Sequence, residues 1–461
     1  MKINKKATTD MLTGPIFKGI LSMSIPIMIM NISQTLFNIM DMTTLRWFSD
    51  DTAVGAVGAC GTLITLFTSL LIGTASGANV VIAKRIGAGK KELANKAVMT
   101  SILLSLVGGL LLMSAGVILA ERILIMTDCP DKLLKGATLY FKIYFYGIPI
   151  QMLYNFCAAI LRATGDTKRP MYYLLIGGAI KVMFTLLFVS RFNMTVDGVA
   201  FATIISNSVA CFLALRKLIK SNGVIHVDFK KLRFSARELK EILFIGIPTG
   251  MQSALYSVAN VAITTAVNGF GPDATTGISI ANQFDGILYQ ISCAPSIAVI
   301  PFIAQNVGAK NIVRVKEITK KAILITILFG GSFGIASAVF SGQLSSIMTS
   351  TPAVIEYSRQ KMIIISSTYF VCGINEVMCG VLRGMGKPII PTVATLVYMC
   401  LFRLVWVYAI FPILPNLTFL YLVWPISWVL SIGTLLIAYL PAIKKLTRII
   451  QQANEKEAVN V

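Results

Sequence analysis

The chain of 461 residues is 56% hydrophobic and only 13% charged, whereas soluble globular proteins carry about 25% charged residues. A chain this apolar cannot cover itself with polar surface, which excludes a soluble protein and makes lipid its expected solvent. The net charge of +21 comes from basic residues in short loops between apolar segments. It therefore indicates membrane topology, and we expect no nucleic-acid partner.

Residue types that catalysts and metal sites need are sparse in this chain. Eight cysteines are scattered without a CxxC pair, so neither a zinc site nor a disulfide framework is predicted. His226 is the single histidine, and no GxxxxGK[ST] phosphate-binding loop occurs, so we expect no ATP binding. A membrane enzyme or receptor would need a catalytic cluster or an extramembrane ligand domain. Neither is present, so we predict no enzymatic activity and no cofactor.

Apolar runs predict twelve membrane-spanning helices, since a span needs about 20 apolar residues. In chain order the predicted ranges are 17–45, 53–83, 94–120, 136–162, 171–191, 196–219, 241–269, 274–305, 315–341, 353–383, 389–411 and 417–443. The fold class is thus an all-α polytopic membrane protein. Its predicted parts are an N-terminal six-helix lobe (1–220), a basic cytoplasmic linker (221–240), a C-terminal six-helix lobe (241–445) and a cytoplasmic tail (446–461).

The distribution of the 41 Lys and Arg residues supports this topology. The cytoplasmic loops of membrane proteins carry an excess of Lys and Arg. This chain satisfies that rule when both of its termini are placed in the cytoplasm. Two basic residues, Lys181 and Arg403, lie within spans. Eight are assigned to outward-facing loops: Arg46, Arg122, Lys132, Lys135, Lys142, Arg191, Arg359 and Lys361. We expect a multi-pass protein of the bacterial inner (plasma) membrane, in contact with membrane lipid.

An internal repeat relates the two halves of the chain. Three pairs of similar stretches share the same sequence offset to within one position, namely 18–26 with 240–248, 83–88 with 304–309, and 161–165 with 382–386. Six helices per repeat give both lobes the same membrane orientation, and such lobes usually enclose a central cavity. Gly165 and Gly386 each permit a left-handed turn at a helix end, where Arg162 and Arg383 are expected to bind the last carbonyl groups.

The repeated stretches resemble signatures of the MATE (multidrug and toxic compound extrusion) transporters of the MOP flippase superfamily. LRATGDTKRP at 161–170 and LRGMGKP at 382–388 are similar to the family's LRGxGDxxxP motif, and QNVGA at 305–309 is similar to its QNxGA stretch. The resemblance covers essentially the whole chain. It implies alternating-access export of small organic molecules against inward flow of Na⁺ or H⁺. We expect the transporter to act as a monomer.

Asp41 is the strongest candidate for the coupling residue. A charge within the membrane is costly and is therefore a functional candidate. Gln34, Asn38 and Asp41 lie on one face of the first helix, and oxygen ligands of this kind suit either Na⁺ or a proton. The resemblance supports Asp41, because a first-helix aspartate is the family's coupling residue. Asn155 and Thr185 complete the predicted ion site, with Asp41 as the metal ligand if the ion is Na⁺.

The second half of the repeat lacks this carboxylate, and the chain departs from the family at two further places. The repeat aligns Asp41 with Ile263, so coupling-ion chemistry is expected in the N-terminal lobe only. On the fifth helix, an Asn-x-x-x-Asp stretch of the family reads Lys181-Val-Met-Phe-Thr185. On the seventh helix, Tyr256 occupies the place of a glutamate that some members carry.

The remaining membrane-embedded polar residues form the predicted substrate cavity: Glu376, Asp285, Asn282, Tyr256, Asn260, Lys181 and Arg403. The offset of the repeat aligns Lys181 with Arg403, so these two residues occupy equivalent places. Two buried cations need counter-charges. Either the carboxylates supply them in an internal network, or one cation binds an anionic part of the substrate.

Two transport functions fit these residues. The first is efflux of cationic or amphiphilic organic compounds coupled to Na⁺ or H⁺. The second is a flippase for a lipid-linked saccharide, whose pyrophosphate a cationic cavity would suit. The LRxxG signatures in both halves and the twelve-helix count favour the exporter.

Overall fold

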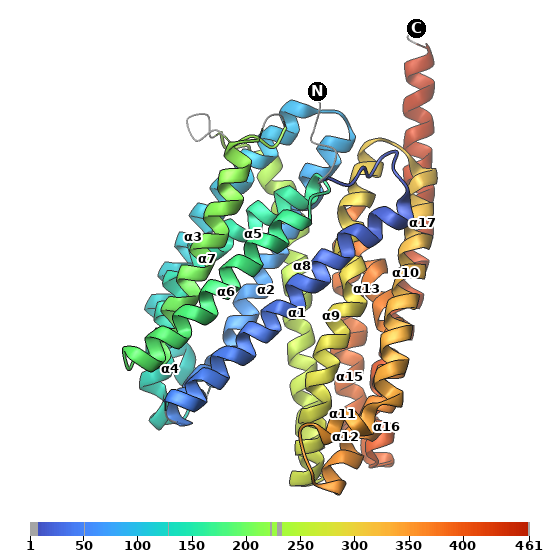
Figure 1. Ribbon diagram of the computed structural model, residues 1–461. Coiled ribbons are helices and arrows are strands. Elements are labelled where there is room, and N and C mark those ends of the chain that lie inside the picture. The colour runs from blue at the N-terminus through green and yellow to red at the C-terminus, as the bar shows by residue number, and fades with distance from the viewer. Residues whose placement is uncertain (1–7, 50, 128, 222–223, 228–232, 460–461) are drawn as a thin grey trace. The chain divides into compact units, whose positions relative to one another are not determined.

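The computed structural model describes residues 8–49, 51–127, 129–221, 224–227 and 233–459, and every regular element within these ranges is helical (Figure 1). The first half contains α1 (Ile16–Phe48), α2 (Asp51–Gly87), α3 (Lys91–Met126), α4 (Asp131–Tyr146), α5 (Ile148–Ala163), α6 (Lys168–Arg191) and α7 (Val196–Ile219). The second half contains α8 (Ala236–Asn268), α9 (Pro272–Gly308), α10 (Ile312–Val339), α11 (Ser341–Ser346), α12 (Pro352–Ser367), α13 (Tyr369–Gly384), α14 (Ile389–Ala394), α15 (Phe402–Val405), α16 (Leu417–Tyr421) and α17 (Val423–Val459).

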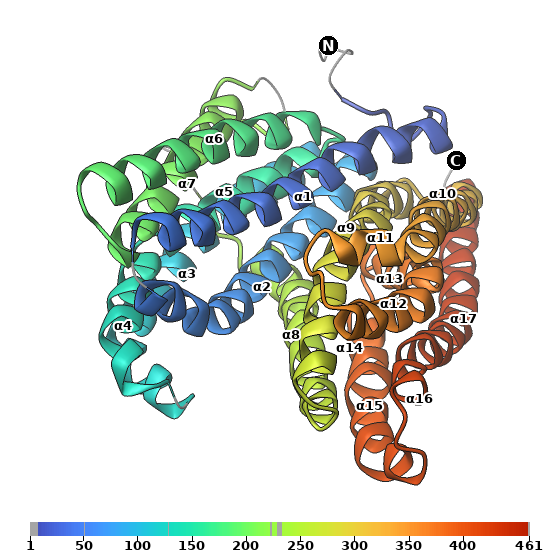
Figure 2. The ribbon, with the colours of Figure 1, turned by 60° about the horizontal axis from the view of Figure 1, so that its bottom comes forward.

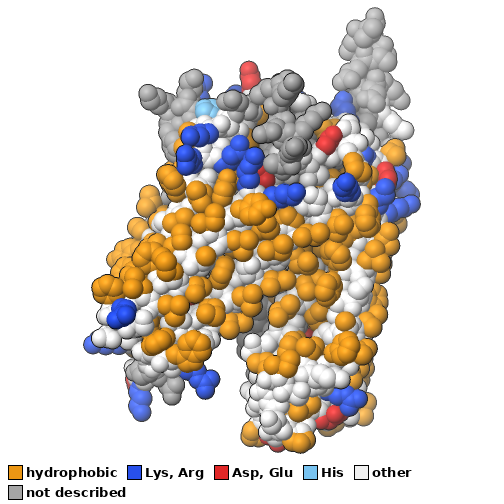
Figure 3. All heavy atoms as spheres, in the orientation of Figure 1, with side chains coloured by type: hydrophobic (Ala, Val, Ile, Leu, Met, Phe, Trp, Pro, Cys, Tyr) orange, Lys and Arg blue, Asp and Glu red, His pale blue; other side chains and the backbone are white. Residues whose placement is uncertain are grey.

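The helices provide the twelve spans that hydropathy predicts. Nine helices within the described ranges are long and apolar enough to cross a membrane, and eleven spans result when the bent pairs α4–α5 and α12–α13 are each taken as one. The 33-residue helix α8 occupies the place of the predicted seventh span. Hydrophobic side chains cover the sides of the helices, while lysine and arginine gather near helix ends (Figure 3).

Two predicted helices, 136–162 and 353–383, are in fact broken. The axes of α4 and α5 differ by 47°, and those of α12 and α13 by 46°. The first break lies at Gly147, where Pro149 in the first turn of α5 has no N–H to donate. The second lies at Thr368, whose hydroxyl bonds back to the Ile364 carbonyl at 2.9 Å. The repeat aligns Gly147 with Thr368, so both halves bend at the same place.

The predicted left-handed turns are confirmed in both halves. Gly165 and Gly386 have φ values of 86° and 77°, and their N–H groups donate to the carbonyls of Arg162 and Arg383 at 2.9 and 2.8 Å. The predicted role of the Arg383 side chain differs from what is observed. The Arg383 guanidinium donates to Oε1 of Gln252 at 2.6 Å instead of to the helix carbonyls.

Internal contacts divide the chain into two compact units that exchange the beginnings of their first helices. The N-terminal unit comprises Met1–Thr9, Ile29–Ile86 and Lys90–Gly250. The C-terminal unit comprises Asp10–Met28, Gly87–Gly89 and Met251–Val461. Both α1 and α8 therefore belong partly to each unit. In the C-terminal unit α9 contacts α10, α12 and α13, which lie around it (Figure 2).

The boundary between the two compact units falls within α8, after Gly250, and the predicted linker 221–240 precedes it. Residues 222–223 and 228–232 of that linker lie outside the described residues. The predicted tail 446–461 continues α17 as a helix to Val459. The division into two six-helix lobes remains a prediction, since the contact-based units follow packing and not span order.

Glycines allow α2 and α8 to pack closely within the N-terminal unit. Gly73 and Gly77 on α2 face Gly246 and Gly250 on α8. A Cβ atom added at Gly73 would lie 2.3 Å from the Gly250 nitrogen, and one at Gly77 would lie 2.2 Å from the Ile242 carbonyl oxygen. Pairs of small residues four apart permit such close approach of membrane helices.

We expect Gly73→Ala to destabilise the protein by about 1–3 kcal/mol, because the added methyl group has no space at this crossing. Thermal unfolding in detergent micelles measures the change. Gly58→Ala on the same helix is the matched control, since a Cβ atom there would meet nothing within 4 Å. Equal unfolding temperatures for the two variants would contradict the close packing.

Equivalent positions near the ends of α2 and α9 each bind the beginning of the first helix of one half, α8 in one case and the residues just before α1 in the other. In the N-terminal unit, Arg85 donates to both carboxylate oxygens of Glu238 at 3.3 and 3.1 Å and to Glu241 at 2.9 Å. We call this group the α8 clamp. In the C-terminal unit, Asn306 donates to the Met11 carbonyl at 3.0 Å, just before α1. Arg85 and Asn306 are equivalent because the repeat aligns them with each other.

Candidate functional site

A buried ion pair joins α1 and α6 in the N-terminal unit. Oδ2 of Asp41 lies 2.6 Å from Nζ of Lys181, and Oδ1 accepts a hydrogen bond from the Thr185 hydroxyl at 3.3 Å. Lys181 and Thr185 are four residues apart and so lie on one face of α6. The two helices approach closely one turn earlier, where a Cβ atom at Gly178 would lie 1.8 Å from the Phe37 ring.

The other predicted ion ligands do not join Asp41. Gln34 and Asn38 are exposed on α1, and no hydrogen bond in the described part of the chain links either of them to Asp41. The Asn155 amide donates to the Gln151 carbonyl of its own helix at 3.0 Å. Among the predicted ligands, only Thr185 therefore contacts the carboxylate.

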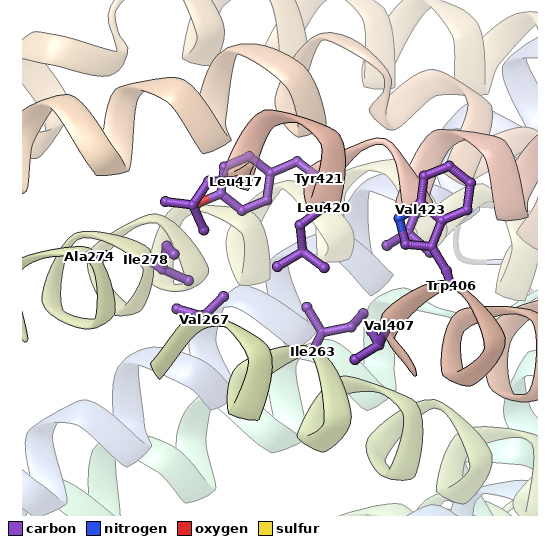
Figure 4. Packing of buried hydrophobic residues seen from close by; sticks show 10 residues of the cluster. All are labelled: Ile263, Val267, Ala274, Ile278, Trp406, Val407, Leu417, Leu420, Tyr421 and Val423. Atoms are coloured by element: carbon purple, nitrogen blue, oxygen red, sulfur yellow. The ribbon is translucent and has the colours of Figure 1, made fainter. Parts of the chain in front are cut away.

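The place equivalent to Asp41 in the C-terminal unit is apolar. Ile263 is 3% exposed within a hydrophobic cluster built from α8, α9, α16, the start of α17 and the helical stretch Trp406–Ile410 (Figure 4). The residues of this cluster are Ile263, Val267, Ala274, Ile278, Trp406, Val407, Leu417, Leu420, Tyr421 and Val423. Packing thus occupies the position where the N-terminal unit has a carboxylate.

A second buried ion pair lies in the C-terminal unit. Nζ of Lys361 on α12 lies 2.9 Å from Oδ2 of Asp285 on α9 and also donates to the Asn282 side chain. The assignment of Lys361 to an outward loop is wrong, because its side chain is only 2% exposed. Val354, Ser358 and Ile365 are buried on the same helical face. Their spacing from Lys361 is the signal that could have identified it.

Arg403 contacts only neutral groups among the described residues. Its guanidinium donates to the Ser427 hydroxyl at 3.2 and 3.1 Å, to Met399 Sδ at 3.3 Å and to Asn260 Oδ1 at 3.4 Å. It lies 5.8 Å from the centre of the Trp424 ring, which also has Lys361 Nζ at 5.7 Å. Of the two alternatives left open by the sequence, an internal carboxylate partner is present for Lys181, whereas no carboxylate among the described residues pairs with Arg403.

One face of α8 binds the charged side chains of α13 and α15. Gln252, Tyr256 and Asn260 recur every four residues along this face. Gln252 accepts from Arg383, the Tyr256 hydroxyl donates to Glu376 Oε1 at 3.0 Å, and Asn260 accepts from Arg403. The structure thus brings Tyr256 together with Glu376, and Asn260 together with Arg403, as members of the predicted substrate site.

The sequence model of the MatE family matches residues 26–187 and 248–409. The two matches begin at Pro26 and Pro248, which the internal repeat also aligns with each other. The chain belongs to the MatE family. It is a multi-pass membrane transporter of the MATE multidrug efflux family, which confirms the resemblance seen in its motifs.

Individual relatives and solved structures agree with this assignment. The chain is 28% identical over 382 residues to the probable multidrug resistance protein YoeA of Bacillus subtilis (strain 168), covering 81% of this chain and 82% of that protein. It is 26% identical to the probable multidrug resistance protein NorM of Thermotoga maritima, with 84% of each covered. An outward-facing MATE transporter of the MOP superfamily has the same fold, with a TM-score of 0.87 at 19% identity over 96% of this chain and 99% of that one.

Proposed function

We propose that this protein exports cationic or amphiphilic organic compounds in exchange for a cation, Na⁺ or H⁺, that binds Asp41. The observation that carries the proposal is the buried Asp41 carboxylate, whose ionic partner among the described residues is the side chain of Lys181. We further propose that the transporter acts as a monomer in the bacterial plasma membrane. The names of its relatives as multidrug resistance proteins support the substrate class.

Lys181 acts as an internal competitor of the coupling ion. Its ammonium group occupies one side of Asp41 at 2.6 Å, so an arriving cation must displace it or protonate the carboxylate. Either event releases Lys181 and changes the contact between α1 and α6. An ion that has different affinity for two conformations shifts their populations, which is all that alternating access requires.

We expect Asp41→Asn to abolish the gradient-driven part of transport, because an amide holds neither a proton nor the charge that attracts Na⁺. Efflux of the fluorescent cation rhodamine 123 from proteoliposomes, under an imposed Na⁺ or pH gradient, measures this effect. We expect the gradient-driven efflux to fall by at least about tenfold, which corresponds to the loss of a single charge interaction of about 1.4 kcal/mol.

Asp273→Asn is the matched control, because Asp273 is an exposed carboxylate in the first turn of α9. It should transport as the wild type does. Unchanged gradient-driven efflux in Asp41→Asn would refute coupling at this residue. The gradient that drives the wild type identifies the ion.

A further inference from the structure

Two opposite charges in the C-terminal unit are buried without an ionic partner among the described residues. Glu376 is 6% exposed and Arg403 is 1% exposed. Across the described ranges, neither lies within ion-pair distance of a side chain of opposite charge, whereas Asp285 and Lys361 in the same unit do pair. Buried charges are normally paired because removal from water costs several kcal/mol per ion. Among the described residues, a charged ligand would therefore have no internal ionic partner to displace at either group.

One turn of α8 carries a hydrogen-bond partner of each of the two charges. Tyr256 binds the carboxylate of Glu376, and Asn260 binds the guanidinium of Arg403. Side chains four residues apart on a helix have Cβ atoms about 5–6 Å apart. Glu376 and Arg403 are thus bound by side chains one helical turn apart, a spacing within the length of a small organic molecule.

Arg403 is held in place by neighbours that leave its charge uncompensated. Ser427 binds two of its nitrogens, and Trp424 lies against its guanidinium. The helix around it is widened on both sides, because Thr395–Leu401 and Trp406–Ile410 are π-helical. Such stretches are rare and frequently occur at functional sites. A guanidinium has five N–H donors. One of the few acceptors that the Arg403 guanidinium contacts is a sulfur atom, Sδ of Met399.

The neighbouring faces of α8 and α9 offer an approach to these charges. Asn260 is exposed, and so is Tyr289 on α9 with 36% of its surface accessible. Gly286 adds open space, since a Cβ atom there would meet nothing within 4 Å. A ligand arriving at this surface meets Asn260, which is in contact with Arg403.

We propose that the C-terminal unit binds amphoteric organic compounds, with a basic group of the ligand against Glu376 and a carboxylate or phosphate group against Arg403. The inference rests on the proposed transport function and narrows its substrate class. A purely cationic ligand neutralises Glu376 and leaves Arg403 unpaired. A ligand that carries both charges satisfies both residues.

The test compares rhodamine 110, which has a free carboxylate, with rhodamine 123, its methyl ester. Binding of each dye to the purified full-length protein is measured by fluorescence polarisation in detergent, without any ion gradient. We expect Arg403→Gln to weaken rhodamine 110 binding about tenfold or more, as loss of a charge-assisted hydrogen bond does. The dissociation constant of rhodamine 123 should change less than about twofold, because this ester has no free carboxylate to bind Arg403.

A second variant keeps the test decisive if Arg403→Gln does not fold. Asn260→Asp is nearly isosteric and gives Arg403 an internal carboxylate partner, which should compete with the carboxylate of rhodamine 110 and lower its affinity selectively. Arg359→Gln is the control, because Arg359 is an exposed arginine on α12. Both dyes should bind that variant as they bind the wild type.

Equal effects of Arg403→Gln and Asn260→Asp on both dyes, or no effect on either, would overturn the proposal. Absence of saturable rhodamine 110 binding to the wild type would overturn it as well. Gradient-driven efflux of rhodamine 123 is a separate measurement. Its persistence alongside unselective binding would leave the transport function standing while rejecting the amphoteric ligand.

Discussion

Lys181→Met is expected to make the stability of this transporter depend on the cation that neutralises Asp41. The substitution keeps an apolar stem of similar length but leaves the Asp41 carboxylate buried without its ionic partner. Breaking one side of a buried ion pair costs about 3–5 kcal/mol. A cation that binds Asp41 restores part of this loss, in proportion to its concentration and affinity.

Thermal unfolding of Lys181→Met then distinguishes the two coupling ions. If the site binds Na⁺, added NaCl raises the unfolding temperature at constant pH, whereas KCl does not. A Na⁺ concentration 100 times the dissociation constant would contribute about 2.7 kcal/mol. If the site carries a proton, stability rises as the pH falls, because protonation removes the uncompensated charge, and Na⁺ has no specific effect.

The double variant Asp41→Asn/Lys181→Met provides the internal check. It removes both charges, which is often neutral for stability, so it should be more stable than Lys181→Met and indifferent to Na⁺ and pH at this site. Lys132→Met, at an exposed lysine on α4, controls for the loss of one charge. A Lys181→Met protein that unfolds like the wild type under all conditions would show that the pair has no energetic role.

A large loss of folding stability is also expected from Arg85→Ala in the α8 clamp. Glu238 is only 1% exposed, so removal of Arg85 leaves a buried carboxylate without its bidentate partner, at a cost of about 3–5 kcal/mol. Equilibrium unfolding in mixed detergent micelles measures the loss. Lys84→Ala, one residue earlier and half-exposed, should cost less than about 0.5 kcal/mol, as surface substitutions do.

A double-mutant cycle separates the clamp from other effects of the substitution. In Arg85→Ala/Glu238→Gln the carboxylate is gone, so much of the lost stability should return. A loss below about 1 kcal/mol in Arg85→Ala, within the usual range for exposed ion pairs, would mean that Glu238 rotates into solvent and that the clamp is weak.

Hydropathy and loop charge were sufficient to predict the helical fold, because span length and orientation depend on local composition. The helix breaks show the limit of prediction from local composition. At Gly147 the sequence carries a proline two residues later, and a break could have been predicted. At Thr368 no comparable residue is present, and the bend lies where α12 and α13 both contact α9 and where the threonine hydroxyl bonds to its own helix.

The candidate site was predictable in its members but not in their pairing. Asp41, Lys181, Glu376 and Arg403 are recognisable in the sequence as charges within apolar spans. Which cation meets which carboxylate depends on how each helix is rotated, and composition does not determine that rotation. Lys361 was overlooked because it lies near the start of a span, although the buried residues around it recur at helical spacing.

The exchange of first-helix segments also has a consequence for biosynthesis. Asp10–Met28 is among the first segments to leave the ribosome, yet it belongs to a unit that is complete only after Met251–Val461 has been made. The N-terminal unit in turn requires the first half of α8, since it includes residues up to Gly250. Translation of the first six spans therefore does not yield a finished half, and the start of the earliest helix joins its unit only when C-terminal spans have been made.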